Sequence, residues 1–392
     1  MCPNNVNAAL GGRSTAATFL TSSISVPTTQ LTKPAHPRYP PRSPEGTIAN
    51  LGYIQLTRNC LQHCRFCSNP PTGVDLDEAR LEGMVQDIAD LGYDGVILTG
   101  GEPTMSPLLE PALRLAHRHG LRTRMITNGQ LLADPRFFER MVRAGLNHVH
   151  LSLHSHQPGV HDFVTAYPRA WSSLVTALSL VPQMGITADI NTVICSYNAD
   201  HLHEIVMWVV DRFPFVHHFV WNMLDPDDNR TQFHTDIIPR HHEFQVSLEL
   251  AMSYLWETGR SFRAERVPLC VMPKFAWANT ECRKIIKEEE RCINFLDAKG
   301  FVQQVEWLHA KGAACDACRW DGICAGLHAM LRGYDERELA PVFEDPDRIV
   351  AEIVHGTPSK ALMARLEARR GRRSPVHQPA DALRLAALAL PL

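Results

Sequence analysis

The 392-residue sequence has no long hydrophobic run and no excess of one charge sign. No apolar stretch approaches the roughly 20 residues that a membrane-spanning helix needs, so we expect no membrane span. Lys and Arg total 39 while Asp and Glu total 42, which gives no sign of a surface for nucleic acid or an anionic membrane. With 45% hydrophobic residues, the chain can bury one large core or two smaller ones.

The amino terminus also lacks a targeting signal. It begins Met-Cys-Pro-Asn-Asn, without the cationic start and apolar core of a secretory signal. Arg13 is the only basic residue before Lys33, which argues against a transit peptide. Five prolines between residues 32 and 46 exclude a continuous helix there. We expect a disordered tail at residues 1–48 and a cytoplasmic protein.

The eleven cysteines are spaced too unevenly for the disulfide framework of a small secreted domain. Three of them fall in one short loop, and seven follow residue 194. Reduced thiols that bind metal fit this distribution better than disulfides do.

From residue 51 onward, strand and helix patterns alternate about six times with short connections. Period-two or fully apolar runs predict strands at residues 53–57, 95–101, 121–129, 147–155, 187–194 and 216–222. Helical spacing predicts helices at residues 77–92, 108–120, 134–145, 170–184 and 200–212. This alternation predicts a parallel sheet wrapped by helices, as an open doubly wound sheet or as a full or partial barrel. In such barrels the chemistry lies where strands end, and the unusual residues of this sequence lie there too.

The alternation stops after about residue 225. Residues 241–258 have helical spacing, and residues 265–335 contain six cysteines, which indicates a second, smaller module. Residues 357–373 predict a basic helix, for which a solvated surface is a sufficient explanation.

The stretch "TRNCLQHCRFC" at residues 57–67 places Cys60, Cys64 and Cys67 directly after the first strand. Cysteine metal sites usually have four protein ligands, so either a distant ligand completes this site or one coordination position stays open. A structural zinc loop, with His63 as a nearby ligand, is one interpretation. Zinc ribbons favour paired x2 spacings, however, whereas iron–sulfur sites include tight triplets. The spacing therefore favours an iron–sulfur cluster.

A glycine turn, "TGGEPTMSP" at residues 99–107, follows the second strand. Gly100 and Gly101 would allow the backbone to approach a ligand closely, because they have no Cβ. The carboxylate of Glu102 could accept hydrogen bonds from an ammonium group, and Pro103 fixes the turn.

The cysteine triplet, followed one strand later by Gly-Gly-Glu-Pro, resembles the radical S-adenosylmethionine (SAM) superfamily over roughly residues 50–225. The resemblance implies a partial (β/α)6 TIM-like barrel and a [4Fe–4S] cluster on the three thiolates, with SAM on the fourth iron. It also implies an electron donor, a reductase such as flavodoxin or ferredoxin. SAM is then cleaved to a 5′-deoxyadenosyl radical that abstracts hydrogen from a substrate. Phe66 matches the aromatic position at which family members touch adenine.

Polar residues at other strand ends fit the same pocket. Alternation along residues 147–155 places four polar side chains on the inward face of the barrel, namely His148, His150, Ser152 and His154. Val149, Leu151 and Leu153 alternate with them and face the helices. The candidates for SAM binding are Asn128, Ser152, His154 and Asn191. For His148 and His150 we favour polar contacts inside the barrel, since alternate residues of a strand are about 7 Å apart and a separate histidine metal site is disfavoured.

The stretch "CDACRWDGICAG" at residues 315–326 resembles part of the SPASM and twitch extensions of radical SAM enzymes. A SPASM pattern continues to a further cysteine, but here that position is His328. The resemblance implies one auxiliary [4Fe–4S] cluster held by Cys315, Cys318, Cys324 and a fourth ligand. Cys270 is the favoured fourth ligand, with Cys282 and Cys292 as alternatives. Zinc in place of iron remains open, since four thiolates suit both metals.

These observations predict four segments: a tail at residues 1–48, a radical SAM core at 49–228, an auxiliary cysteine-rich domain at 229–345 and a helical basic tail at 346–392. The predicted function is oxidative modification of a ribosomally made peptide or a small biosynthetic intermediate. One alternative is a small-metabolite dehydrogenase, decarboxylase or rearrangement enzyme of the same superfamily. Another is a non-catalytic zinc-binding scaffold. The first 48 residues are too short and proline-rich for a leader-binding domain, so a separate protein could recognise a peptide substrate.

Overall fold

The computed structural model describes residues 51–226, 230–287, 289, 291–296, 300–304, 307–328 and 333–355. Contacts divide the chain into Met1–Glu45 and Gly46–Leu392, and every described residue belongs to the second unit. The predicted tail at 1–48 and the predicted helix at 357–373 lie outside the described residues. So does most of the predicted segment 346–392.

Within the described part of the chain, nine strands form one sheet in the order β7-β6-β5-β4-β3-β2-β1-β8-β9. Neighbouring strands are parallel except for the antiparallel pair β8 and β9. The two edge strands, β7 and β9, do not pair with each other, so the described strands form an open, partial barrel. The strands are β1 Leu51–Thr57, β2 Gly95–Gly100, β3 Arg122–Thr127, β4 His148–Ser152, β5 Thr187–Ile194, β6 His218–Met223, β7 Ser261–Glu265, β8 Arg291–Asn294 and β9 Phe301–Gln304.

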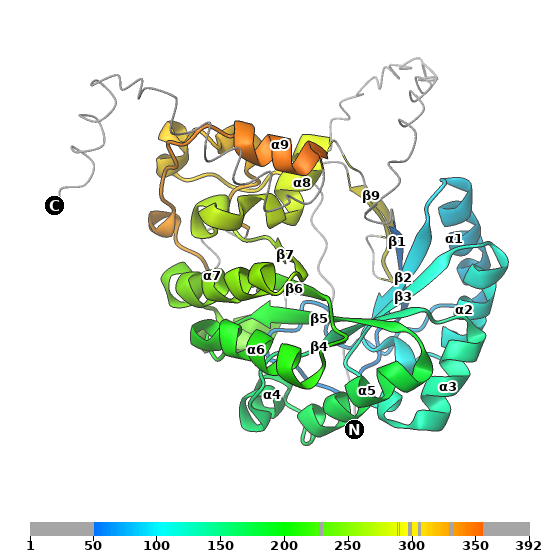
Figure 1. The fold of residues 1–392 in the computed structure, drawn as a ribbon. Helices are drawn as coiled ribbons and strands as arrows, with labels where there is room; N and C mark the ends of the chain where they lie inside the picture. Colours follow the sequence, from blue (N-terminus) through cyan, green and yellow to red (C-terminus); the bar gives the residue numbers. More distant parts are fainter. Residues whose placement is uncertain are drawn as a thin grey trace, which may run out of the picture. The chain divides into compact units, whose positions relative to one another are not determined.

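The helices from α1 to α7 follow the outer side of the sheet, as the ribbon shows (Figure 1). The helices are α1 Glu78–Asp90, α2 Leu109–Arg118, α3 Pro135–Ala144, α4 Pro158–Thr165, α5 Ala170–Met184, α6 Leu202–Arg212, α7 His241–Glu257, α8 Thr280–Lys287 and α9 Asp347–His355. Local signals fix several of these ends. The side chain of Asp134 accepts a hydrogen bond at the start of α3, and Gly145, with φ of 120°, ends that helix.

The main hydrophobic core lies between the sheet and its outer helices. Along β4, Val149, Leu151 and the following Leu153 are buried in this core, as the alternation predicted. His148 and His150 occupy the opposite face of the strand. The sheet therefore presents apolar side chains to the helices and polar side chains to the inside of the barrel.

All six predicted strands and the five predicted helices between them are confirmed. The same sheet also contains strands from beyond residue 225, where the alternation was predicted to stop. α7 leads into β7, which pairs with β6, and β8 pairs with β1. The prediction missed β7 because its alternation of Phe262 and Ala264 with polar residues extends over only five residues. It also missed α4, whose first residues, Pro158 and Gly159, are typical of a loop.

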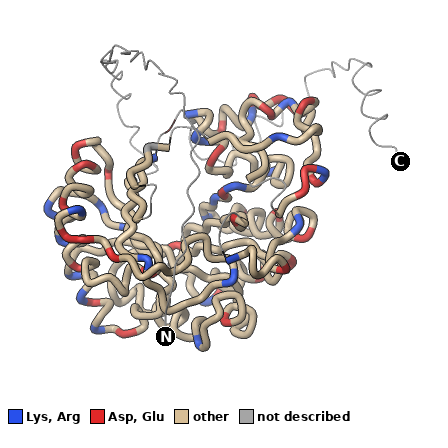
Figure 2. The backbone as a smooth tube through the Cα atoms, turned by 180° about the vertical axis from the view of Figure 1, so that it is seen from behind, with Lys and Arg blue, Asp and Glu red and all other residues tan. Residues whose placement is uncertain are grey.

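Basic and acidic residues are interspersed along the described elements (Figure 2). None of the described helices has both the length and the apolar composition needed to cross a membrane.

Candidate functional site

The three loop cysteines lie directly after β1 and are half-buried. Backbone hydrogen bonds fix the loop at both ends. The N–H of Arg58 donates to the carbonyl of Val74 at 2.7 Å, and the N–H of Arg65 donates to the carbonyl of Val164 in α4 at 2.9 Å. Strand β1 and helix α4 together therefore hold the cysteines in place.

Burial keeps the three loop thiols protonated. Burial and the nearby carboxylate of Glu102 raise the pKa of Cys60 to about 11. Burial raises the pKa of Cys64 as well, and the neighbouring Cys67 and Cys60 add to the rise. Burial also raises the pKa of Cys67. Three sulfurs so close together lose their protons readily only when a cation compensates their charge, so the donor set fits a metal or an iron–sulfur cluster.

The glycine turn packs against the cysteine loop. A Cβ on Gly100 would lie 2.2 Å from the carbonyl oxygen of Thr57, and one on Gly101 would lie 2.2 Å from that of Asn59. The N–H of Gly101 donates to Thr57 at 2.7 Å, and the N–H of Glu102 donates to Asn59 at 2.7 Å. The close approach that the structure shows is thus between two protein segments. The expected contact of the glycines with a ligand stays a prediction.

The carboxylate of Glu102 is buried and joins the turn to the end of β3. Its Oε1 accepts hydrogen bonds from the N–H and hydroxyl of Thr104, at 3.0 and 2.7 Å, and from the hydroxyl of Thr127 at 2.7 Å. Its Oε2 accepts from the N–H of Asn128 at 2.8 Å. Burial raises the pKa of Glu102, although these hydrogen bonds oppose the rise. Pro103 is buried and begins the short helical turn that follows. Binding of an ammonium group by Glu102 stays a prediction.

Asn128 connects the end of β3 to the cysteine loop. Its side-chain nitrogen lies 3.7 Å from the sulfur of Cys60, a donor–sulfur contact. Its Oδ1 accepts from the N–H of Gln130 at 3.0 Å, which fixes the side chain. Cys60, Glu102 and Asn128, predicted from three separate stretches of sequence, are therefore neighbours in space.

Phe66 and His154 pack against each other beside the cysteine loop. Their ring centroids are 4.7 Å apart in an edge-on arrangement. Phe66 belongs to a small apolar cluster with Val164, Leu224 and Ile237, against which Cys64 packs. His154 is 3% exposed, and its Nδ1 accepts from the N–H of Val193 at 3.2 Å. Roles for Phe66 at adenine and for His154 at SAM stay predictions.

Ser152 and Asn191 are direct neighbours on β4 and β5. Both are half-buried on the inward face. The Oδ1 of Asn191 accepts from the side chain of Asn222 on β6 at 2.6 Å. The two predicted SAM-binding side chains thus lie at the carboxyl end of the sheet, where the loops of the site begin.

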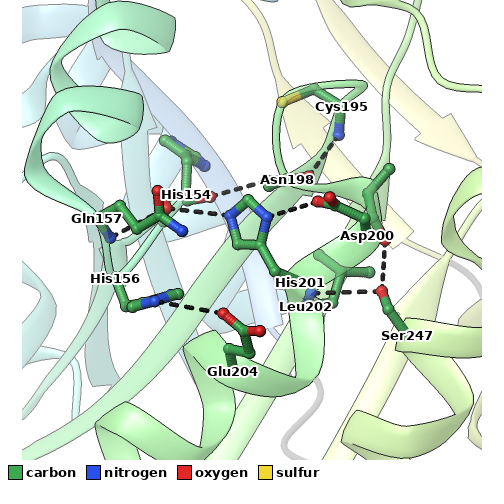
Figure 3. Close-up of polar contacts among 12 residues, drawn as sticks. His154, His156, Gln157, Cys195, Asn198, Asp200, His201, Leu202, Glu204 and Ser247 are labelled. Atoms are coloured by element: carbon green, nitrogen blue, oxygen red, sulfur yellow. Dashed lines mark hydrogen bonds and ion pairs between the residues drawn. The ribbon is translucent and has the colours of Figure 1, made fainter.

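Asn198 joins the ends of β4 and β5 behind this face (Figure 3). Its Nδ2 donates to the carbonyls of His154 and Val193 at 2.8 and 2.9 Å, and its Oδ1 accepts from the N–H of Cys195 at 2.8 Å. Next to it, the Nε2 of His201 lies 3.2 Å from the hydroxyl of the fully buried Ser155. These contacts are internal to the protein and set the position of both strand ends.

Four of the carboxy-terminal cysteines gather around one small pocket. Its lining includes the four sulfur residues predicted as auxiliary ligands, Cys270, Cys315, Cys318 and Cys324. Burial, together with the other three thiols, raises the pKa of Cys270 to about 11. The N–H of Val342 donates to the sulfur of Cys318 at 3.4 Å, and that of Gly326 donates to Cys324 at 3.4 Å. Hydrogen bonds to sulfur are a feature of iron–sulfur sites, so this donor set fits a cluster as well.

The alternative ligands do not line this pocket, although Cys318 and Cys324 pack against the cluster that contains Cys282. Cys282 is fully buried and packs in the apolar cluster that contains Trp320, next to the pocket but outside its lining. Cys292 is buried on β8. His328 does not line the pocket either, since its Nε2 lies 3.2 Å from the carboxylate of Asp225 beyond β6. The geometry therefore favours Cys270 as the fourth member of the group.

Sequence reasoning missed several residues that support the site. Thr127 and Thr104 donate hydrogen bonds to the carboxylate of Glu102, and Thr127 directly precedes the predicted site residue Asn128. Asn198 lies in a loop without any motif, so nothing in the sequence singles it out. The Nζ of Lys311 donates to the carbonyl of Cys324 at 2.7 Å, a contact between residues too far apart for a local pattern.

Residues 54–209 match the family model described as the radical SAM superfamily. The match runs from β1 into α6 and includes the loop cysteines and the glycine turn. It also includes the strand-end residues Asn128, Ser152 and Asn191.

Among curated proteins, the chain is similar to enzymes named PqqA peptide cyclase. The one from Gluconobacter oxydans is 31% identical over 155 residues, which cover 38% of this chain and 43% of the relative. The one from Ruegeria pomeroyi is 29% identical over 175 residues, which cover 43% of this chain and 46% of the relative. The chain thus spans somewhat less than half the length of these curated relatives.

Among solved structures, Streptococcus suis SuiB bound to S-adenosylmethionine aligns with a TM-score of 0.55 and 16% identity, over 75% of this chain and 76% of SuiB. Native anSMEcpe with bound AdoMet aligns with a TM-score of 0.53 and 15% identity, over 82% of this chain and 100% of anSMEcpe. At these identities the likeness is one of fold. The sequence match, the order of the two motifs and the fold agree: this chain contains a radical SAM domain at residues 54–209, a type of domain that works with a [4Fe–4S] cluster and SAM.

Proposed function

We propose that this protein is a radical SAM enzyme that modifies a ribosomally made peptide by hydrogen abstraction. The observation that carries the proposal is the convergence of two motifs: the half-buried thiols of Cys60, Cys64 and Cys67 lie in a loop that the Gly-Gly-Glu-Pro turn contacts directly. Three thiolates leave one position of a four-iron cluster open for SAM.

Cys60, Cys64 and Cys67 would hold a [4Fe–4S] cluster, which together with SAM would supply the one-electron chemistry for hydrogen abstraction. The chain's own residues position the reactants and exclude water. Phe66, Val164 and Leu224 form an apolar wall against Cys64. Asn128 donates toward the sulfur of Cys60, and Ser152 and Asn191 lie side by side on the inward face of β4 and β5.

We propose further that Cys270, Cys315, Cys318 and Cys324 hold an auxiliary [4Fe–4S] cluster. Their common pocket and the N–H donors that face two of the sulfurs support this assignment. A fully thiolate-bound cluster has no open position for SAM, so its role is electron transfer or substrate anchoring. We expect a reductase such as flavodoxin or ferredoxin to supply the electron, and a reducing compartment, the cytoplasm, to keep the thiols reduced.

The peptide assignment rests on the name of the curated relatives, PqqA peptide cyclase. The test is to incubate the reduced protein and SAM with peptides, and separately with small metabolites, encoded or produced by neighbouring genes. We expect a peptide to stimulate 5′-deoxyadenosine formation and to lose hydrogen, as detected by mass spectrometry. Stimulation by a metabolite alone would contradict the peptide assignment while leaving the radical chemistry intact.

Metal analysis distinguishes the enzyme from a zinc-binding scaffold. After anaerobic reconstitution we expect about eight irons per chain, and about four in either the Cys60/Cys64/Cys67→Ala or the Cys315/Cys318/Cys324→Ala variant. Cys292→Ala, which removes a buried thiol outside both groups, serves as the control and should keep the full iron content. A colourless protein with zinc at both groups would contradict the proposal.

A further inference from the structure

A polar cluster lies on the inward face of the sheet, below the residues considered for SAM. His150 precedes Ser152 by two positions on β4, and Asp189 precedes Asn191 by two positions on β5. The cluster therefore lies one layer closer to the amino ends of these strands, and the proposed function assigns nothing to it. His148, at the start of β4, is its third member.

Three possible ligand atoms converge in this cluster. The Nε2 of His148 lies 2.8 Å from the Oδ2 of Asp189, and the Nδ1 of His150 lies 3.6 Å from the same oxygen. One ligand atom from each residue can be chosen so that all three lie within 4.8 Å of one another. The ligand atoms of a tetrahedral ion with bonds of about 2.0–2.1 Å are about 3.4 Å apart. Small rotations of the two rings would bring the three atoms to this separation.

The spacing argument that disfavoured a histidine metal site does not hold in the structure. The positions of His148 and His150 on the strand are as expected, but their rings lean together, with centroids 4.8 Å apart. The third ligand comes from the neighbouring strand β5, which local sequence spacing does not reveal. Asp189 is the register partner of His150 across the two strands.

Contacts inside the cluster orient the ring of His148, and its Nε2 lies within hydrogen-bond distance of Asp189. The Nδ1 of His148 lies 2.6 Å from the hydroxyl of Thr187, a contact that fixes the ring with Nε2 toward Asp189. Metal-bound histidines are oriented by such outer partners. His150 is 7% exposed, and its Nε2 is buried with no hydrogen-bond partner among the described residues. The nitrogen of His150 that lies near Asp189 is Nδ1, at 3.6 Å, and this is the ring atom we consider as the ligand.

The chemistry of the donors also suits a metal. The cluster offers two imidazole rings and one carboxylate, which are common ligands of divalent transition metals.

Positive groups face the cluster from other strands. Burial lowers the pKa of Arg124 on β3, while the nearby carboxylate of Asp189 opposes this shift and Arg263 adds to it. His218 on β6 is also nearby, and burial followed by Arg263 lowers its pKa to about 3. These arginines repel a cation, so only an ion that binds nitrogen ligands strongly can occupy the cluster.

We propose that His148, His150 and Asp189 bind one divalent transition-metal ion inside the barrel, a site separate from both cysteine groups. Two nitrogens and one carboxylate oxygen suit Zn²⁺, Fe²⁺ or Co²⁺ rather than Mg²⁺ or Ca²⁺. The ion would cross-link β4 to β5 directly below the residues considered for SAM.

The test uses the full chain with both cysteine groups already filled with iron and sulfide. Co²⁺ is then added, and its visible ligand-field absorption and the bound cobalt per chain are measured after desalting. We expect one Co²⁺ per chain in the wild type, without the sulfur-to-cobalt charge-transfer band that cysteine ligands produce. A cluster-filled wild-type protein that binds no cobalt would overturn the proposal, whether or not the protein cleaves SAM.

Variants then assign the ligands. We expect Co²⁺ affinity to fall at least tenfold in His150→Ala and in Asp189→Asn, and to stay unchanged in His117→Ala, which alters an exposed histidine of α2. Arg124→Met should bind Co²⁺ more tightly, because it removes a repelling charge. Zn²⁺ should raise the melting temperature of the wild type but not of His150→Gln. Equal cobalt affinity in the wild type and His150→Ala would exclude this ligand set.

Discussion

Gly101 is the residue at which the glycine turn comes nearest to the cysteine loop. An added Cβ would lie 2.2 Å from the backbone oxygen of Asn59, and backbone cannot rotate away as a side chain can. We expect Gly101→Ala to displace the loop and to reduce iron uptake from about eight to about four atoms per chain.

Gly83 on α1 is the matched control, because a Cβ there would meet no atom within 4 Å. Gly83→Ala should keep the iron content and stabilise the fold by about 0.5–1 kcal/mol, since alanine favours a helix. Full iron content in Gly101→Ala would show that the turn and the loop are not coupled as the structure indicates.

Glu102 is the second residue at which the account can be tested. Its buried carboxylate accepts four hydrogen bonds, and in Glu102→Gln an NH2 group replaces one of the two oxygens. Depending on the orientation of the amide, this group faces either the N–H of Asn128 or the donors of Thr127 and Thr104, and it cannot accept their hydrogen bonds. We expect the variant to lose about 1–3 kcal/mol of folding stability in chemical denaturation. Glu82→Gln, at an exposed position on α1, should lose almost nothing.

SAM affinity of the same variant tests the predicted ammonium contact separately. A drop in affinity while the protein remains folded supports that contact. Unchanged affinity together with lower stability would leave Glu102 a purely structural residue.

At the scale of elements, Asn198 connects the ends of β4 and β5 through the hydrogen bonds of its side chain. Its side chain satisfies two carbonyls and one N–H, and the residue is fully buried. Asn198→Ala leaves these backbone groups without partners, so we expect a loss of about 2–4 kcal/mol in unfolding free energy. Ser179→Ala, on the exposed side of α5, should be nearly neutral. A neutral Asn198→Ala would mean that the strand ends are held by other contacts.

The sequence allowed most elements to be predicted, and the exceptions have physical reasons. Strands β1 to β6 have alternating or apolar patterns, and most of them are followed by a helix with clear spacing. β7 and β8 have five and four residues, and what makes them strands is pairing with β6 and β1, far away in the sequence. α4 begins with Pro158 and Gly159, which local propensity assigns to a turn.

The site was predictable to the extent that it consists of motifs. The two cysteine groups and the Gly-Gly-Glu-Pro turn have fixed spacings and could be placed from the sequence alone. The partners of Glu102 and the convergence of His148 and His150 on Asp189 could not, because side-chain direction across neighbouring strands decides them.

At the scale of the whole molecule, buried histidines make stability depend on pH. Burial lowers the pKa of His161 to about 4, although Asp162 opposes the shift. An unfolded histidine titrates near 6.5, so the unfolded chain binds more protons between these values. The stabilising effect is therefore complete above about pH 6.5 and is lost as the pH falls toward 4.

We expect the wild type to lose folding stability between pH 7 and pH 5, measured by denaturation at equal cluster loading. His161→Gln should lose about 1–2 kcal/mol less over this interval, because its side chain no longer takes up a proton. His117→Gln, at an exposed position, should follow the wild type. An identical pH response of His161→Gln and the wild type would contradict a buried, neutral His161.

The central claim is that Cys60, Cys64 and Cys67 hold the cluster that cleaves SAM, and one measurement tests it most directly. Reconstituted wild type and the Cys60/Cys64/Cys67→Ala variant are reduced anaerobically with SAM, and 5′-deoxyadenosine is quantified. We predict formation by the wild type and none by the variant, although the variant retains about four irons at the second cysteine group. Undiminished 5′-deoxyadenosine formation by the variant would contradict the account.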